Sequence, residues 1–393
     1  MNRRRFLAAS AAGLTASTAG CVDAFESAAE TTYGREPPLV DPRPEGVYWP
    51  THTEEMAMAG MGTTSDGRRV SLMYTFPHRF WRVFQEGDGY ESRIFEVEAD
   101  DAVHLMANVW DAETGVVLPV SSVDIAVTGG NDVDERETIY PMLSQRMGFH
   151  YGDNYHLDGD GGYTAAVTVG GVTADRFGEF EERLDTPETV EIEFEYSEAG
   201  RNDLTFTEYE QAGEAGAVDP MAMDGMGMNE AGTDGMGMNE AGTDGMGMNE
   251  AGTDGMGMDG MEMGGMPMGT VGELGGTAMG ETVADDIRYR ASLLAGDRFG
   301  GPYLAVTAAT RYNEFVVPGM GLAATVTGAD GETVLSESLS PGLDPEAGFH
   351  YGVAAPGLTG EEDVTVDVTT PPQVARHEGY ETAFFSTPTV SLS

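Results

Sequence analysis

The sequence predicts an all-β protein with two antiparallel β-sandwich domains joined by a long segment of low complexity. Short segments in which apolar and polar residues alternate recur in both halves of the chain, and this period of two is typical of half-buried strands. Glycine and aspartate turns separate the segments, and helical periodicity is scarce. The pentapeptide Gly-Phe-His-Tyr-Gly occurs at 148–152 and again at 348–352. This repetition indicates that the two domains are related.

Length and charge limit the possible functions. The chain has 393 residues, which is enough for two domains and their linkers. Its formal net charge is -47, from 67 acidic and 20 basic residues. Such a surface repels nucleic acid and anionic membranes, so we expect no nucleic-acid partner. A dense carboxylate surface stays hydrated in strong salt and indicates a halophilic protein; a surface that collects cations is the alternative.

Residues 1–21 resemble a twin-arginine export signal that ends at a lipoprotein cleavage site. Arginines at 3–5 precede Phe6, and a run of small apolar residues leads to Cys21, the one cysteine of the chain. Thr18 departs from the aliphatic residue usual at that place. The apolar run is too short to span a bilayer. We expect Cys21 to be lipidated and to anchor the protein at the extracellular face of the cell membrane; a cleaved signal with an incidental cysteine is the alternative.

The first domain is expected after a short tether. Residues 22–45 are small, acidic and rich in proline, which is typical of an exposed tether. Residues 46–210 then carry the alternating pattern of the first sandwich. The predicted strands of this domain are 70–76, 92–98, 102–110, 116–120, 123–127, 163–169 and 189–196.

Residues 211–281 form a linker rich in methionine and glycine. A decapeptide begins at Met226 and repeats at Met236 and Met246. The repeat has no apolar face of either period, so we expect it to be disordered. Two interpretations remain open. The thioethers bind Cu(I) weakly, or the segment is an acidic linker in which the methionines are incidental.

The second domain is predicted over 282–393 and looks like a divergent copy of the first. Pro341 precedes His350 by the same interval at which Pro141 precedes His150. The predicted strands of this domain are 287–294, 304–310, 315–317, 322–326, 333–339, 364–368 and 382–385.

A candidate metal site combines histidine with methionine. His104 and Met106 lie on one face of their predicted strand, because alternate strand residues point to the same side. Met142 and His150 supply the other half of the site, from a loop and from the start of a strand. Imidazole binds copper, iron, zinc and nickel, and thioether favours Cu(I). The alternative for each residue alone is a core methionine or a hydrogen-bonded histidine.

Other residues are weaker candidates. His52 and the nearby methionines Met56, Met58 and Met61 precede the first strand and form a possible flap over the site. His78 follows Pro77 at an expected strand end, and we assign it a structural role. The possible additional metal ligands are His52, Met56, His156, His350 and His377.

The segments His104-Leu105-Met106, Pro141-Met142 and His150-Tyr151-Gly152 together resemble the periplasmic iron-transport protein family. Members bind copper and iron and work beside high-affinity iron permeases. The resemblance covers residues 46–200 and, more weakly, 285–390. It implies an immunoglobulin-like β-sandwich fold, a copper and/or iron ion, and an iron permease or another membrane transporter as partner. It also implies a homodimer, or a pseudo-dimer within the chain.

The resemblance assigns His104, Met142 and His150 to three ligand positions of the family. Met106 stands where the family has glutamate, which softens the site and puts ferric coordination in doubt. A further family histidine has no match in domain one, where Phe177 follows Arg176.

In domain two, His377 sits near the place of that further histidine. Tyr303 replaces His104 there, and Gly342 replaces Met142, so we expect domain two to have lost the full site. We therefore expect the two sandwiches to pack together, with His377 reaching toward the site of domain one.

These observations predict an extracytoplasmic metal-binding lipoprotein that assists iron or copper uptake or handling, and not an enzyme. The sequence has no nucleotide-binding glycine fingerprint and no serine–histidine–aspartate set with supporting spacing. A structural or adhesive surface lipoprotein without metal function is the alternative. A cupredoxin-like electron carrier is a third possibility, but it lacks the cysteine ligand, since Cys21 belongs to the export signal.

Overall fold

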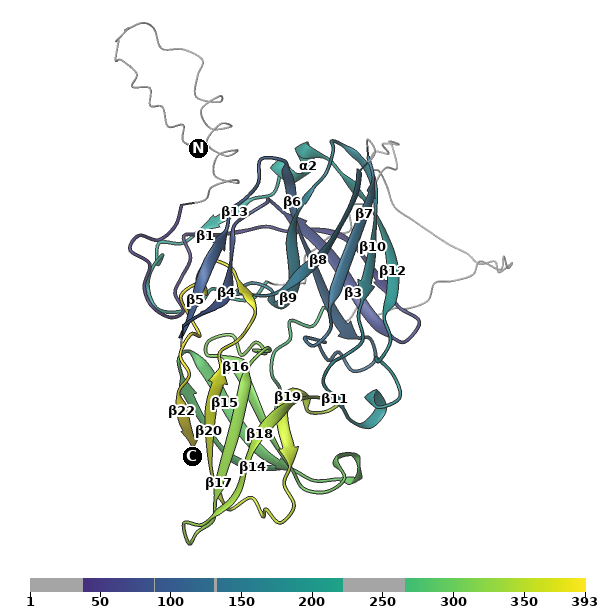
Figure 1. Cartoon of the computed structure of the whole chain (residues 1–393). Coiled ribbons are helices and arrows are strands. Elements are labelled where there is room, and N and C mark those ends of the chain that lie inside the picture. Colours follow the sequence, from purple (N-terminus) through teal and green to yellow (C-terminus); the bar gives the residue numbers. More distant parts are fainter. Residues whose placement is uncertain (1–37, 88, 131–132, 222–265) are drawn as a thin grey trace, which may run out of the picture.

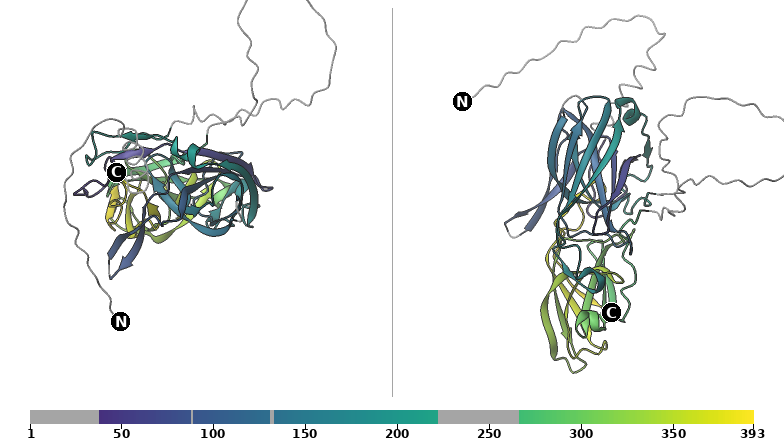
Figure 2. Two further views of the ribbon diagram at one scale, coloured as in Figure 1. Left: turned by 90° about the horizontal axis from the view of Figure 1, so that it is seen from above. Right: turned by 90° about the vertical axis from the view of Figure 1, so that its right-hand side faces the viewer.

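The computed structural model describes residues 38–87, 89–130, 133–221 and 266–393. These residues form two antiparallel β domains, which confirms the predicted all-β fold class (Figure 1). The two domains are stacked end to end, so the molecule is elongated when it is seen from the side (Figure 2). The predicted export signal, Cys21 and the decapeptide repeats lie outside the described residues.

Domain one is a sandwich in which one long strand, β8 (Val133–Ser144), belongs to both layers. Residues 133–139 pair with β7, and residues 140–144 pair with β9 in the other layer. The first layer contains β7 (Val123–Gly129), β10 (Gly161–Val169) and β12 (Glu188–Tyr196). The second contains β9 (Gly148–His156), β6 (Asp101–Asp111), β3 (Arg68–Thr75) and β2 (Ala57–Thr63).

Short elements complete domain one beside the second layer. A hairpin of β4 and β5 extends this layer. β1 and β13 pair with each other and form a separate two-stranded sheet. Their bounds are β1 (His52–Glu54), β4 (Phe80–Glu86), β5 (Gly89–Phe95) and β13 (Phe206–Glu208). The described helices are short: η1 (Gly178–Phe180) and α2 (Glu198–Asn202) belong to domain one, and η2 (Asp297–Phe299) belongs to domain two.

Domain two repeats this topology strand by strand. Its order β14-β15-β16-β19-β18-β17-β20-β22 matches β2-β3-β6-β9-β8-β7-β10-β12 of domain one. β18 (Thr333–Asp344) divides between two layers just as β8 does. The other strands are β14 (Thr277–Ala284), β15 (Ile287–Leu294), β16 (Tyr303–Thr310), β17 (Gly321–Thr327), β19 (Gly348–Ala354), β20 (Asp363–Thr370) and β22 (Thr389–Leu392).

The two domains exchange short strands reciprocally. β11 (Asp175–Arg176) leaves domain one and pairs in parallel with Gly342 and Leu343 of β18. β21 (Ala375–Arg376) leaves domain two and pairs in parallel with Met142 and Leu143 of β8. Figure 1 shows the yellow C-terminal segment rising from domain two toward β4. Each domain therefore contributes residues to the sheet of the other.

Three of the predicted strands are wrong. Residues 116–120 and 315–317 form only isolated bridges and turns between longer strands. Residues 382–385 form a bend in which Ala383 and Phe384 are fully buried, and the C-terminal strand is β22 instead. A buried turn produces the same apolar spacing as a short strand, so alternation alone does not separate the two.

The ends of the predicted linker are packed rather than free. Met221 and Met266 are each 6% exposed and belong to the hydrophobic core. β14 begins at Thr277, inside the range predicted as linker. These two apolar side chains are therefore removed from water within the described structure. Within the described residues, no helix is long and apolar enough to cross a membrane.

Glycines let two strands of domain one approach closely. β2 and β12 lie against each other at the open side of the sandwich. A Cβ atom at Gly60 of β2 would lie 2.6 Å from Cγ2 of Ile192 in β12, which is closer than real Cβ atoms come to a neighbour. Ile192 is 4% exposed, so it has little room to move away. The absence of a side chain at Gly60 is therefore a packing requirement of this sandwich.

We expect Gly60→Ala to lower the free energy of unfolding by about 1–3 kcal/mol, because the added methyl overpacks the β2–β12 contact. Denaturant unfolding of the full-length protein measures the change. Gly89→Ala in β5 is the matched control, since its nearest neighbour would be the Glu86 carbonyl at 3.8 Å. Equal stability of Gly60→Ala and Gly89→Ala would show that the close approach is not required.

Candidate metal centre

Four potential metal donors meet where the reciprocal strand β21 joins domain one. His104 lies on β6, Met142 on β8 and His150 on β9, and these three side chains are 0–1% exposed. Met142 stands directly opposite His150 in the β8–β9 register, and Ala375 of β21 stands beside Met142. His377 follows β21 and donates its backbone N–H to the carbonyl of Leu143 at 3.2 Å. Four predicted residues are therefore gathered at one point.

The donor atoms face one another. Nε2 of His377 lies 3.2 Å from Sδ of Met142 and 3.2 Å from Nε2 of His150. Nε2 of His104 and Sδ of Met142 both lie over Gly152, where a Cβ atom would be 2.7 Å from the nitrogen and 3.2 Å from the sulfur. Gly152 thus leaves open the space into which two donors point. We expected Met142 on a loop, and the structure places it within a strand.

Asn154 fixes the protonation of His104. The Asn154 amide nitrogen donates to the carbonyl of His78 at 3.1 Å, and its Oδ1 accepts from the His78 backbone N–H at 3.3 Å. These two contacts settle the orientation of the amide. Oδ1 also faces Nδ1 of His104 at 2.9 Å, so Nδ1 must carry the proton and donate. Nε2 of His104 is consequently a bare lone pair.

That lone pair is buried and has no hydrogen-bond partner among the described residues. An unsatisfied buried polar atom costs about 1–3 kcal/mol in a protein. Burial, followed by the nearby His78, holds the pKa of His104 well below its ordinary value. The ring is therefore neutral at pH 7, and its unpaired nitrogen is available to a ligand.

His150 and His377 are held neutral in a similar way. Nδ1 of His150 lies 3.1 Å from the carbonyl of Gly148, which can only accept, so Nε2 carries the lone pair. Burial lowers the pKa of His150 to about 4. Burial, together with the neighbouring imidazoles, also holds the pKa of His377 well below its ordinary value. Metal ions bind the unprotonated form of imidazole, so all three rings are in the state that binding needs.

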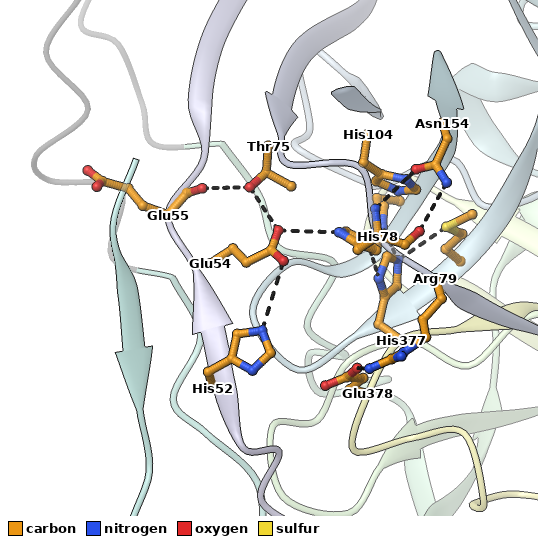
Figure 3. A network of polar contacts seen from close by, with 12 residues as sticks. His52, Glu54, Glu55, Thr75, His78, Arg79, His104, Asn154, His377 and Glu378 are labelled. Carbon is orange, nitrogen blue, oxygen red and sulfur yellow. Dashed lines mark hydrogen bonds and ion pairs between the residues drawn. The ribbon is translucent and has the colours of Figure 1, made fainter. Parts of the chain in front are cut away.

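His78 belongs to this group, although the sequence suggested only a structural role. It lies between β3 and β4, and its Nε2 is 2.8 Å from Nδ1 of His377. Its Nδ1 lies 3.3 Å from Oε2 of Glu54, which also accepts from the Thr75 hydroxyl at 3.0 Å (Figure 3). Burial alone would raise the pKa of Glu54, but His78 and His52 outweigh it and lower this pKa to about 2.

A cavity of about 90 Å³ adjoins the imidazoles. It brings three predicted residues beside the donors, because His52, Met56 and Met106 line it together with His150 and His377. Nε2 of His52 lies 3.9 Å from Oε1 of Glu54. Met106 packs in the hydrophobic core. These residues line the cavity beside the donors, whereas Met58 and Met61 of the predicted flap are not among its lining residues.

Two predicted residues lie away from both the donors and the cavity. His156 lies at the far end of β9, where its Nδ1 is 2.8 Å from the carbonyl of Asp100. A β-strand rises about 3.3 Å per residue. His156 lies six residues after His150 on β9, so it is too far along the strand to reach the ligands near His150. His350 lies in domain two and is fully buried, with its Nδ1 3.0 Å from the carbonyl of Gly348.

The corresponding place in domain two is filled by aromatic rings. Phe177 follows β11 as His377 follows β21, and its ring stacks on His350 with centroids 5.9 Å apart. A Cβ atom at Gly342, opposite His350, would lie 2.6 Å from Nε2 of that histidine. Tyr303 packs edge-on to His350 with centroids 5.6 Å apart. This place offers one imidazole among apolar rings and no thioether.

The donors of domain one fit a borderline or soft metal ion. Two nitrogens that each lie about 2 Å from one tetrahedral ion are about 3.3 Å apart, and Nε2 of His150 and Nε2 of His377 are 3.2 Å apart. Neutral imidazoles suit copper, iron, zinc and nickel, and a thioether selects for Cu(I). The set of His104, Met142, His150 and His377 therefore fits copper in particular.

Residues 272–393 match a family model described as a domain of unknown function, DUF7350. No curated protein matches the chain. The part of the chain that matches this family model is domain two, whose place corresponding to the site carries aromatic rings.

Solved structures with some similarity include two copper-bound variants. One is FetP from uropathogenic Escherichia coli, with 20% identity, a TM-score of 0.27, and coverage of 36% of this chain and 97% of that chain. The other is P19 from Campylobacter jejuni, with 18% identity, a TM-score of 0.27, and coverage of 36% of this chain and 98% of that chain.

Gly152→Ala tests whether the space over Gly152 is the binding position. The added methyl would enter between Nε2 of His104 and Sδ of Met142, so we expect copper affinity to fall by more than tenfold. Isothermal titration with copper measures the affinity, and circular dichroism checks the fold.

Gly352→Ala in domain two is the matched control, because its methyl would lie 2.5 Å from the Tyr303 hydroxyl and overpack that domain equally. Copper affinity unchanged in Gly152→Ala, or reduced equally in both variants, would show that the ion does not bind over Gly152.

Proposed function

We propose that this chain is a metal-binding protein whose site in domain one holds one copper ion. His104, His150 and His377 supply imidazole nitrogens, and Met142 supplies a thioether. The observation that carries the proposal is the buried lone pair of His104, which Asn154 aims into the site and which has no partner among the described residues. Nε2 of His350 in domain two also has no partner among the described residues. What distinguishes His104 is that its lone pair lies over Gly152 beside the thioether of Met142.

Copper explains the donor set better than iron does. Ferric iron prefers oxygen donors, whereas this set offers three neutral nitrogens and one sulfur. Met106 lines the cavity where a carboxylate would harden the site. The mixture of imidazole and thioether serves both Cu(II) and Cu(I), so the protein can hold the ion through a change of oxidation state. In this proposal the site binds copper. Iron is handled only in a process that is coupled to copper binding.

We further propose that the protein works outside the cytoplasm on a lipid anchor at Cys21. The arginine-rich N-terminus and the small residues before Cys21 support this location. At the membrane, the chain would handle the metal for an iron permease or another transporter rather than catalyse a reaction. A fully folded site suits the twin-arginine route, which carries folded proteins.

Histidine variants test the proposal directly. We expect the full-length protein to bind one copper ion with high affinity, and His104→Ala or His377→Ala to weaken this binding by more than about 100-fold, the upper range for changes around metal ligands. Titration against a competing chelator measures the affinity, and elemental analysis of the purified protein gives the stoichiometry.

His156→Ala and His350→Ala are the controls, since neither histidine lies with the four donors. Copper binding that survives both His104→Ala and His377→Ala would reject the site. The protein would then be the structural surface lipoprotein that the sequence left as the alternative.

Met142→Leu separates the two oxidation states. Leucine keeps the volume of the buried side chain but removes the sulfur, so we expect the affinity for Cu(I) to fall more than the affinity for Cu(II). Competition with chelators specific for each oxidation state measures both values. Equal losses for the two ions would show that the sulfur is not a ligand.

A further inference from the structure

Three segments that are distant in sequence form a chain of hydrogen bonds behind the proposed copper site. Glu54 ends β1, His78 lies between β3 and β4, and His377 comes from domain two. Oε2 of Glu54 lies 3.3 Å from Nδ1 of His78, and Nε2 of His78 lies 2.8 Å from Nδ1 of His377. Figure 3 shows this row from Glu54 to His377. Both nitrogens of His78 are therefore engaged.

The row fixes each proton when Nε2 of His377 holds a metal ion. The one proton of that ring is then on Nδ1, which donates to Nε2 of His78. Nδ1 of His78 in turn donates to the carboxylate of Glu54, which only accepts. Nε2 of His377 then offers its lone pair to the ion, and this is the atom that lies 3.2 Å from Met142 Sδ and from His150 Nε2.

His78 itself is poorly placed to be a ligand. Nitrogens of His78, His104 and His377 lie within 4.8 Å of one another, which by itself would suit a shared ion. However, the ring of His78 stacks on that of His104 with centroids 4.1 Å apart and planes inclined by 29°. Stacked rings present their nitrogens side by side rather than toward one point, and the nitrogens of His78 already have Glu54 and His377 as partners.

We infer that Glu54 and His78 are positioning residues, which orient His377 and fix its tautomer so that Nε2 binds the metal ion. This inference rests on the proposed copper site. A carboxylate that acts through an imidazole also makes the ligand a stronger donor. The negative charge of Glu54 favours the ion of higher charge, so the row strengthens Cu(II) binding more than Cu(I) binding.

Thr75 and Asn154 hold the row in place. The Thr75 hydroxyl donates to Glu54 Oε2 at 3.0 Å, and Asn154 binds both the backbone N–H and the carbonyl of His78. One amide thus orients His104 through its side chain and His78 through its backbone. The ligand His104 and the positioning residue His78 are therefore held by the same amide.

Two variants of Glu54 test the inference in the full-length protein. Glu54→Leu removes the acceptor, so we expect Cu(II) affinity to fall about 10–100-fold and Cu(I) affinity to fall less. Glu54→Gln keeps an oxygen that accepts from His78 but removes the charge, so we expect a smaller loss. Glu55→Leu is the matched control on the next residue, because the Glu55 side chain binds Thr205 at the surface. Chelator competition measures both affinities.

Nuclear magnetic resonance of the Cu(I)-loaded protein with ¹⁵N-labelled histidine reports the tautomer directly. We expect wild type and Glu54→Gln to show a proton on Nδ1 of His377 and the metal on Nε2. If Glu54→Leu fails to fold, the tautomer of His377 in wild type and in Glu54→Gln still tests the positioning role.

The outcomes distinguish failure of the proposed copper site from failure of the positioning role of Glu54 and His78. A wild-type protein that binds no copper rejects the proposed function. A wild-type protein that binds copper through His377 Nδ1, or a folded Glu54→Leu variant with unchanged Cu(II) and Cu(I) affinities, overturns the positioning role and leaves the copper site standing.

Discussion

The site depends on one short backbone contact between the domains. Ala375 and Arg376 pair in parallel with Met142 and Leu143, and this pairing places the next residue, His377, against the donors of domain one. Arg376 anchors the segment from within, because its guanidinium donates to the carbonyls of Pro372 and Phe384 at 3.3 Å each. Burial lowers the pKa of Arg376 to about 9, so it still carries a charge at pH 7. Without this pairing, domain one would hold only three of the four donors.

Neutral imidazoles are the second constraint on the site. The chain carries a large excess of acidic residues, yet the described surroundings of His104 and His150 are strands packed on both sides. An acidic surface raises the pKa of nearby histidines, but burial lowers the pKa of His104 and His150, so these rings are neutral. The carboxylate of Glu54 reaches the donors only through His78. The imidazole donors thus stay neutral, and the lone pairs of His150 and His377 face each other.

The sequence predicted the fold class, and it named His104, Met142 and His150 as ligands with His377 as a possible further one. It did not predict the way these side chains are oriented, and it placed Met106 among the ligands, whereas Met106 packs in the core beside the cavity. The period of two identified most strands, and the spacing of His104, Met142 and His150 identified most of the site. His78 was missed because its partners, Glu54 and His377, are 24 and 299 residues away in sequence. No local pattern records such contacts. The false strand at 382–385 has a related cause, since a buried bend at Phe384 shows the same apolar spacing as a strand.

Reciprocal strand exchange within one chain has a consequence that two separate subunits would not share. In a symmetric pair of identical subunits, each would lend a histidine to the other, and dilution would dismantle both sites together. Here domain two, which supplies His377, is covalently attached to domain one. The effective concentration of His377 at the site therefore stays constant however dilute the protein becomes. The covalent link also frees the halves from symmetry. Phe177 could take the place that matches His377, because the chain no longer needed two working copies of the same site.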